Sequence, residues 1–288
     1  MRVLIAGCGW LGCAIGAALA RAGHRVVGAR RDLAAGETME SMGIQPWPVD
    51  LMRLETLGKP FDAIVACQSA DQRTPRAYRQ AYVELNEHLL RLADAEGVSR
   101  FIYTGSTGVL SYDDGRDVDE TTSPRSVDER GALLVEAESM VLAAGRGKLQ
   151  TSLVRLSGLY GPGRHGTVQR VRDGRLALGP GDERTMNWCH RDDAVRMVIQ
   201  MLDRGRGGAI YHASDAHPTS RRDVVNWIAH RLGIEPRRND EDPGEGRASH
   251  RRVLADRSRE ELGVELVHAD FRHGLDAGWE EIRSNVDR

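Results

Sequence analysis

The stretch VLIAGCGWLG at residues 3–12 decides the fold. It joins a short apolar run to a G-x-G-x-x-G motif, and an amphipathic run over residues 11–21 follows directly. In a dinucleotide-binding βαβ unit the first glycine makes a tight turn, the second lets the backbone approach a pyrophosphate, and the third lets the helix pack on the strand. The N–H groups and the dipole of the helix N-terminus then attract the phosphate charge. We therefore predict that the cofactor is bound by Gly7, Gly9, Trp10, Leu11 and Gly12.

The end of the next predicted strand, which covers residues 25–28, indicates which dinucleotide is preferred. An acidic side chain at this place binds the ribose 2′-hydroxyl of NAD, whereas an arginine holds the 2′-phosphate of NADP with charge-assisted hydrogen bonds. The chain has Arg30 and Arg31 here, followed by Asp32. We predict a preference for NADP(H). The alternative is that both arginines are solvated and that Asp32 serves NAD(H).

The first half of the chain alternates short apolar runs with longer amphipathic ones, which predicts a parallel sheet covered by helices on both faces. Strands are expected at residues 3–6, 25–28, 43–49, 61–67, 100–104 and 151–156, and helices at 11–21, 77–96 and 126–144. Ser126 and Glu129 have the S-x-x-E spacing of a capping box, which would start the last of these helices.

We expect an α/β Rossmann-type, doubly wound parallel sheet with a smaller C-terminal substrate lobe. Residues 1–157 would form the dinucleotide-binding part, residues 185–214 would return to it, and most of residues 158–288 would form the lobe. Helices are expected at 192–202 and 220–232, and a mobile surface loop at 237–250, which is polar and rich in glycine.

The composition is that of an ordinary globular protein. Of 288 residues, 40% are hydrophobic and 28% charged, and the net charge of −2 indicates no nucleic-acid or membrane surface. Because the chain opens on a strand and has no long apolar run, we expect no signal peptide, no membrane span and a cytoplasmic protein. The cysteines form no C-x-x-C pair and the histidines no H-x-x-x-H pair, which predicts reduced thiols and no metal.

Several further motifs make the chain resemble the extended short-chain dehydrogenases/reductases of the NAD-dependent epimerase/dehydratase type. Besides the glycine motif, they are VDL at residues 49–51, YVELN at 82–86, FIYTGSTGV at 101–109, RLSGLYGPG at 155–163 and NWCHRDD at 187–193. The resemblance covers nearly the whole chain. It implies that Asp50 and Leu51 lie at the adenine, and we expect Gln68 among the cofactor-binding residues as well.

The catalytic set of that family is a serine, then a tyrosine and a lysine spaced Y-x-x-x-K on the following helix. Ser106 matches the serine, which hydrogen-bonds the reacting oxygen in the family. Alignment through Gly131 and Glu138 puts Arg130 at the tyrosine position and Leu134 at the lysine position. The chain thus resembles an atypical branch that lacks the Tyr-Lys pair.

Another group must therefore exchange the proton in this chain. Arginine stays protonated, so Arg130 would supply positive charge to a substrate rather than a proton. The candidate donors are Tyr112, Tyr160, Glu129 and His165. We place Tyr112 beside Ser106 and Arg130 in the expected catalytic set, while His190 and Asp193 are expected to serve the start of a helix.

Two functions remain open from the sequence. The first is an NADP(H)-dependent oxidoreductase or epimerase/dehydratase-like enzyme that acts on a small carbonyl, alcohol or imine substrate. The second is a sensor or regulatory protein that binds the dinucleotide without turnover, which the missing Tyr-Lys pair motivates. The helices at 77–96 and 126–144 resemble those that pair in many relatives, so a homodimer is expected.

Overall fold

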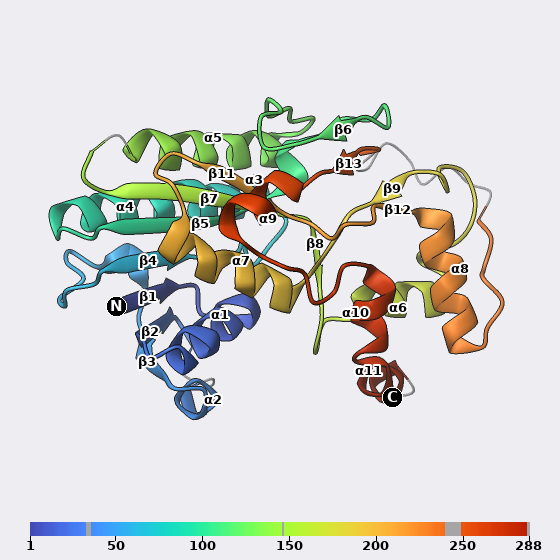
Figure 1. Ribbon diagram of the computed structural model, residues 1–288, viewed down its shortest axis with the longest axis horizontal. Helices are drawn as coiled ribbons and strands as arrows, with labels where there is room; N and C mark the ends of the chain where they lie inside the picture. The colour runs from blue at the N-terminus through green and yellow to red at the C-terminus, as the bar shows by residue number, and fades with distance from the viewer. Residues whose placement is uncertain (33–35, 146, 240–248, 287–288) are drawn as a thin grey trace.

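A seven-stranded parallel sheet forms the centre of the computed structural model, which describes residues 1–32, 36–145, 147–239 and 249–286 (Figure 1). The strand order is β11-β7-β5-β4-β1-β2-β3, so the chain reverses its direction of winding between β1 and β4. The strands are β1 (Arg2–Ala6), β2 (Arg25–Arg30), β3 (Ile44–Pro48), β4 (Ala63–Ala66), β5 (Arg100–Ser106), β7 (Gln150–Leu156) and β11 (Ile210–Ala213). The predicted doubly wound Rossmann sheet is confirmed.

Helices cover both faces of this sheet, which is why its strands are apolar throughout. They are α1 (Trp10–Arg21), α2 (Gly36–Ser41), α3 (Pro75–Tyr78), α4 (Leu85–Ala95), α5 (Glu129–Ala144), α7 (Arg191–Arg204) and α9 (Asp256–Leu262), with short helical turns η2 (Leu51–Arg53) and η4 (Thr107–Val109). Val3 and Ile5 of β1 belong to the core under α1 and α7. Leu4 and Ala6 belong to the core under α4 and α5. Alternate residues of one strand thus serve opposite faces, as its period of two requires.

The smaller lobe stands beyond the sheet, at the right of Figure 1. Its elements are β8 (Gly158–Tyr160), α6 (Gly166–Arg172), β9 (Thr185–Met186), β10 (Trp188–His190), β12 (Thr219–Ser220), α8 (Arg221–Leu232), α10 (Phe271–Asp276) and α11 (Trp279–Val286). An aromatic cluster fills its core, where Trp188 stacks on Phe271 and Trp227 meets the edge of the same ring. A further two-stranded pair, β6 (Asp117–Val118) with β13 (Arg252–Val253), connects the loop after β5 to the C-terminal part of the chain.

The helix expected from Ser126 begins instead at Glu129, so the capping-box prediction is wrong. The preceding chain is still extended, since the Arg125 N–H donates to the Val109 carbonyl at 2.7 Å. The side chain of Asp128 accepts the Gly131 N–H at 2.7 Å and caps the helix in place of Ser126.

The helix expected at 77–96 is continuous but not regular. It consists of α3, a π-helical segment η3 (Arg79–Glu84) and α4. Of the loop expected at 237–250, residues 240–248 lie outside the described part of the chain. Among the described residues no helix is both long and apolar enough to cross a membrane.

Candidate cofactor and active site

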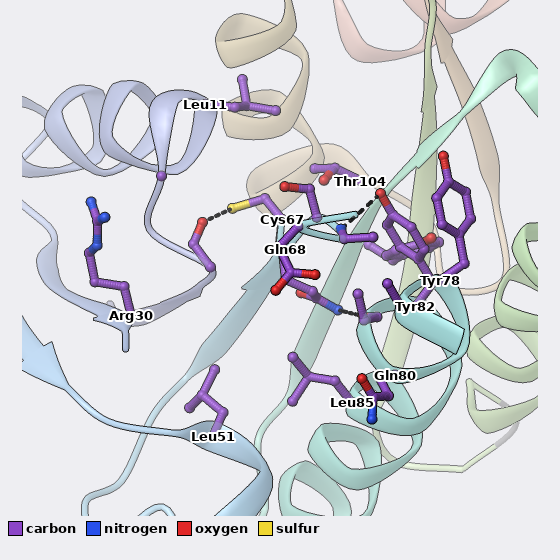
Figure 2. A pocket seen from close by; sticks show the side chains of 18 of the residues that line it. Leu11, Arg30, Leu51, Cys67, Gln68, Tyr78, Gln80, Tyr82, Leu85 and Thr104 are labelled. Carbon is purple, nitrogen blue, oxygen red and sulfur yellow. Dashed lines mark hydrogen bonds between the residues drawn. The ribbon is translucent and has the colours of Figure 1, made fainter. Parts of the chain in front are cut away.

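A cavity of about 900 Å³ runs across the carboxyl ends of β1, β2, β4 and β5. This is the edge, at the reversal of winding, where open α/β sheets bind their ligands. Figure 2 shows Arg30 and Leu51 on one side of it and Tyr78, Tyr82 and Thr104 on the other. Every residue named above for cofactor binding lines this cavity except Gly12: Gly7, Gly9, Trp10, Leu11, Arg30, Arg31, Asp50, Leu51 and Gln68.

The glycine loop has the shape that a bound pyrophosphate requires. Gly7 has φ of +81°, and a Cβ there would lie 2.4 Å from the Cα of Gln68. A Cβ on Gly12 would lie 2.7 Å from the Gly7 carbonyl oxygen, so Gly12 serves the close contact of α1 with the loop. A Cβ on Gly9 would meet nothing nearer than 4.0 Å, and this residue faces the cavity. Gly9 is also the N-cap of α1 and offers no side-chain acceptor, which leaves the helix N-terminus to a ligand.

Trp10 connects this loop to the lobe. Its Nε1 donates to the Pro162 carbonyl at 2.8 Å, and the guanidinium carbons of Arg164 and Arg191 lie 5.2 and 5.3 Å from its ring centroid. Arg164 also lines the cavity and is exposed there. The sequence analysis missed it, although it directly follows the glycine-rich segment after β8.

Two arginines stand at the other end of the cavity. Arg30 Nη2 lies 3.6 Å from an Asp32 carboxylate oxygen, and Arg31 Nη2 lies 3.8 Å from one of Asp71. The Arg30 side chain is 32% exposed and that of Arg31 73% exposed, so Arg30 is the better fixed cation. All four side chains line the cavity. Asp50 lies beside them, where its Oδ1 accepts the Met52 N–H at 3.2 Å and caps η2.

Gln68 sits at the middle of the cavity, at the end of β4. Its Nε2 donates to the Asn86 side-chain oxygen at 2.9 Å and to the Ala81 carbonyl at 3.2 Å. Its Oε1 is buried and has no hydrogen-bond partner among the described residues. Because buried acceptors are normally satisfied, this oxygen is suited to a donor on a ligand or on water.

Ser106 ends β5 and lines the cavity. Its Oγ accepts the Gly108 N–H at 3.1 Å and so caps η4. The hydroxyl proton is not used by any described residue and remains free to donate to a ligand. Leu134, at the family's lysine position, lines the same end of the cavity.

Arg130 and Tyr112 do not line the cavity. The Arg130 guanidinium forms an ion pair with Asp128 at 2.7 Å and lies 6.0 Å from the ring centroid of Tyr78. Tyr112 donates its hydroxyl to the Ser123 carbonyl at 3.0 Å and packs in a small cluster with Val109 and Leu110. The geometry therefore does not bring Tyr112 together with Ser106 in the cavity.

The other three candidate proton donors also occupy structural positions. Tyr160 is buried in the lobe core, and burial raises the pKa of its hydroxyl well above the ordinary value. Glu129 is the first residue of α5, and the His165 Nε2 accepts the Gly163 N–H at 3.2 Å. Three tyrosines that the sequence analysis did not weigh line the cavity instead: Tyr78, Tyr82 and Tyr103.

A buried ion pair supports the Ser106 end of the site. Arg155 of β7 is 0% exposed and donates to the Glu138 carboxylate of α5, with Nη2 at 2.9 Å. Burial raises the pKa of Glu138, and the hydrogen bond from Arg155 opposes that shift. A Cβ on Gly105, next to Ser106, would lie 3.3 Å from a Glu138 carboxylate oxygen. The pair therefore fixes α5 directly behind the end of β5.

Outside the cavity, His190 caps the start of α7, as the sequence suggests, whereas Asp193 of the same turn binds the segment before α10. The His190 Nδ1 accepts the Asp192 N–H at 3.2 Å, and the Asp193 carboxylate accepts the Val267 N–H at 2.7 Å. The rings of His190 and His268 are 3.8 Å apart, and burial together with His268 lowers the pKa of His190 to about 4. His190, Asp192 and His268 each bring one ligand atom within 4.8 Å of the others, a cluster that sequence spacing does not reveal.

Comparison with known proteins agrees with this geometry. The sequence matches the NAD dependent epimerase/dehydratase family over residues 3–214. The chain belongs to that family. It is similar to protein YeeZ of Escherichia coli, with 31% identity over 283 residues that cover 93% of this chain and 97% of YeeZ. The resemblance predicted from the motifs is confirmed, and the dinucleotide-binding fold is that of the family.

Two other similar proteins have lower sequence identity to this chain. One is a ketoreductase of Stigmatella aurantiaca that acts on a 4-hydroxy-2-methyl-3-oxo-4-farnesyl-3,4-dihydroquinoline-1-oxide, with 24% identity over 82% of this chain and 74% of that protein. The other is the crystal structure of UDP-glucose 4-epimerase of Thermotoga maritima, with a TM-score of 0.84, 18% identity, and coverage of 99% of this chain and 100% of the other. The latter supports the fold alone.

Proposed function

We propose that this protein is an NADP(H)-dependent oxidoreductase that acts on a small carbonyl, alcohol or imine compound. The observation that carries the proposal is one open cavity that extends from the two arginines after β2 to Ser106 and the first residues of the lobe. An NADP(H) molecule has its 2′-phosphate at one end and its reactive nicotinamide at the other, and the family fold orients it in that sense. A cavity filled by side chains would instead favour a sensor without turnover.

The residues present fit the dinucleotide. Gly7 and Gly9 with the N-terminus of α1 would hold the pyrophosphate, Asp50 and Leu51 the adenosine, and Arg30 with Arg31 the 2′-phosphate. Gln68 would accept a hydrogen bond through its unpaired Oε1. When bound, the dinucleotide would supply or accept a hydride.

The chain's own residues then orient the substrate. The free proton of Ser106 would donate to the substrate oxygen or nitrogen. Leu134 presents an apolar surface at this end, and Arg164 offers a positive charge on the lobe side. A substrate with a polar reacting group, an apolar body and a negative or strongly polar end fits these three contacts.

The test measures NADPH oxidation at 340 nm with a panel of ketones, aldehydes and imines, alongside NADH as the second cofactor. Turnover of at least one compound, faster with NADPH, supports the proposal. Tight NADPH binding without turnover of any compound, and without epimerisation of a sugar nucleotide, would favour the sensor instead. Equal rates with NADH would leave an oxidoreductase but overturn the cofactor preference.

We further propose a homodimer through α4 and α5, as in many family members. Sedimentation equilibrium of the purified protein tests it, and a mass of one chain at micromolar concentration would refute it.

A further inference from the structure

The family's proton-exchanging tyrosine is absent, yet the cavity is not without tyrosines. The chain has six, and three line the cavity: Tyr78, Tyr82 and Tyr103. Tyr103 is 1% exposed, and burial raises the pKa of its hydroxyl well above the ordinary value. Tyr82 uses its hydroxyl to accept the Ala70 N–H at 3.4 Å, and burial raises its pKa too. Burial therefore opposes ionisation of both hydroxyls.

Tyr78 differs from both. It is only partly buried, and its hydroxyl makes no hydrogen bond to the described residues. Its ring is nevertheless fixed on two sides, because the Tyr82 ring meets it edge-on at 5.2 Å and the Arg130 guanidinium carbon lies 6.0 Å from its centroid. Figure 2 shows Tyr78 and Tyr82 projecting from the same helix.

The helical segment that carries Tyr78 is fixed on both sides of this residue. Thr74 caps α3 by accepting the Ala77 N–H, and the π-helical segment η3 starts directly after Tyr78. Such π-helical segments are frequent at functional sites. Arg79 then forms an ion pair with Glu136 of α5 at 3.2 Å, which fixes Tyr78 against the helix that carries the family's catalytic positions.

We propose that Tyr78 exchanges the proton in place of the missing family tyrosine, and that Arg130 is its positioning residue. This proposal rests on the proposed oxidoreductase function. In the reduction of a carbonyl, the hydride goes from the dinucleotide to carbon, and the Tyr78 hydroxyl gives its proton to oxygen as the C=O bond becomes C–O–H. The remaining phenolate is stabilised by the Arg130 charge and regains a proton from water. A hydroxyl in one helix and a cation in another thus perform what one Y-x-x-x-K helix does in relatives.

The test compares Tyr78→Phe with Tyr82→Phe as the matched control, since both remove one hydroxyl from neighbouring rings. We expect Tyr78→Phe to lower kcat by about 10²- to 10⁴-fold, the usual contribution of a positioned acid-base group, with KM and NADPH affinity nearly unchanged. Tyr82→Phe should keep kcat within about tenfold. Arg130→Gln should lower kcat less than Tyr78→Phe does and should leave NADPH affinity unchanged. A Tyr78→Phe protein as active as the parent would overturn the proposal while the oxidoreductase function stood.

A crystal structure of the NADPH complex decides the role of Tyr78 without any turnover. The expected result is that the Tyr78 hydroxyl faces nicotinamide C4 across a gap in which a carbonyl oxygen would be within hydrogen-bond reach, about 2.6–3.2 Å. A hydroxyl that contacts the adenosine half, or that is turned out of the cavity, would overturn it. If this geometry is found but no compound is reduced, the oxidoreductase proposal fails on its own.

Discussion

In the proposed NADP(H) site, one arginine would decide between the two dinucleotides. Arg30 is the less exposed of the two cations at the end of β2, and its guanidinium is fixed near Asp32. We expect Arg30→Ala to weaken NADPH binding by about 10- to 100-fold, the loss of one charge-assisted contact of about 1.5–3 kcal/mol, and to leave NADH binding nearly unchanged. Arg31→Ala, the more exposed neighbour, is the control and should weaken it less. Calorimetric titration measures both; equal affinity of the parent protein for NADPH and NADH would refute the preference.

The Ser106 hydroxyl caps η4 through its oxygen, and no described residue accepts its proton. Ser106→Ala should lower kcat/KM by about 10- to 100-fold if the hydroxyl donates to the reacting oxygen. Ser106→Thr keeps the hydroxyl and should recover most of the activity. Melting temperatures of both variants separate a loss of the cap from a loss of the contact. Full activity of the alanine variant would remove Ser106 from the site.

Residues of the proposed cofactor site could be predicted from the sequence because they sit at fixed offsets from one strand. Gly7, Gly9 and Arg30 belong to a continuous βαβ unit, whose local order determines where they lie. Tyr78 and Arg164 were not accessible in this way. They reach the cavity from a π-helical turn and from the lobe, and only the packing of α3 on α5 and of Pro162 against Trp10 brings them there.

At the scale of elements, the position of α5 depends on a buried ion pair. Arg155 and Glu138 have side chains only 1% and 3% exposed, so removal of one partner leaves the other charged in an apolar setting. We expect Glu138→Gln or Arg155→Met to lower the free energy of unfolding by about 3–5 kcal/mol. The double variant Glu138→Leu with Arg155→Met should recover much of this loss, because no unpaired charge remains. Urea unfolding measures all three, and a double variant as unstable as the sum of the singles would contradict the argument.

Element types could be predicted more reliably than element ends. The helix after residue 126 has the expected periodicity, but two acceptors compete for its first N–H groups, and the strand-like pairing of Arg125 prevents Ser126 from reaching them. Asp128 therefore caps the helix. The π-helical segment within the helix at 77–96 has no sequence signature of its own, since it arises where α3 and α4 pack against a neighbouring helix.

At the scale of the whole molecule, the alternation of strands with helices predicts a parallel sheet, whereas no pattern in the sequence predicts the contact between the sheet and the lobe, here called the seam. Short strand pairs such as β8 with β10 and β6 with β13 join segments far apart in the chain. Buried polar groups gather on this seam: the Asp215 N–H donates to the Trp188 carbonyl at 2.7 Å, and Asp215 as a whole is 3% exposed. This buried polar environment forms only when the lobe packs against the sheet, so the sequence alone does not reveal it.

The buried Asp215 carboxyl at this seam makes the stability of the whole fold depend on pH. Burial, with a smaller contribution from Asp270, raises the pKa of Asp215 from 3.8 to about 8 in the folded protein, while Arg259 and the N–H groups of His217 and Phe271 oppose this. Between these two values the unfolded chain has lost the proton and the folded chain keeps it. The folded state binds more protons, so the free energy of unfolding falls as pH rises from about 4 to about 8 and is level above that.

Asp215→Asn keeps the shape of the side chain and removes this titration. We therefore expect urea unfolding at pH 5, 7 and 9 to show the parent protein losing stability relative to Asp215→Asn as pH rises. The loss can reach at most several kcal/mol, because each tenfold change in proton affinity corresponds to about 1.4 kcal/mol. His212 serves as a control with the opposite pH dependence. Burial lowers its pKa to about 4, so the stability that its neutral form contributes is lost as pH falls below about 6.5. His212→Gln should reduce the loss of stability at acid pH and should leave the loss that Asp215 causes as pH rises. A constant difference between the parent and Asp215→Asn at all three pH values would mean that the Asp215 carboxyl is ionised in the folded protein, and that water or a cation reaches the seam.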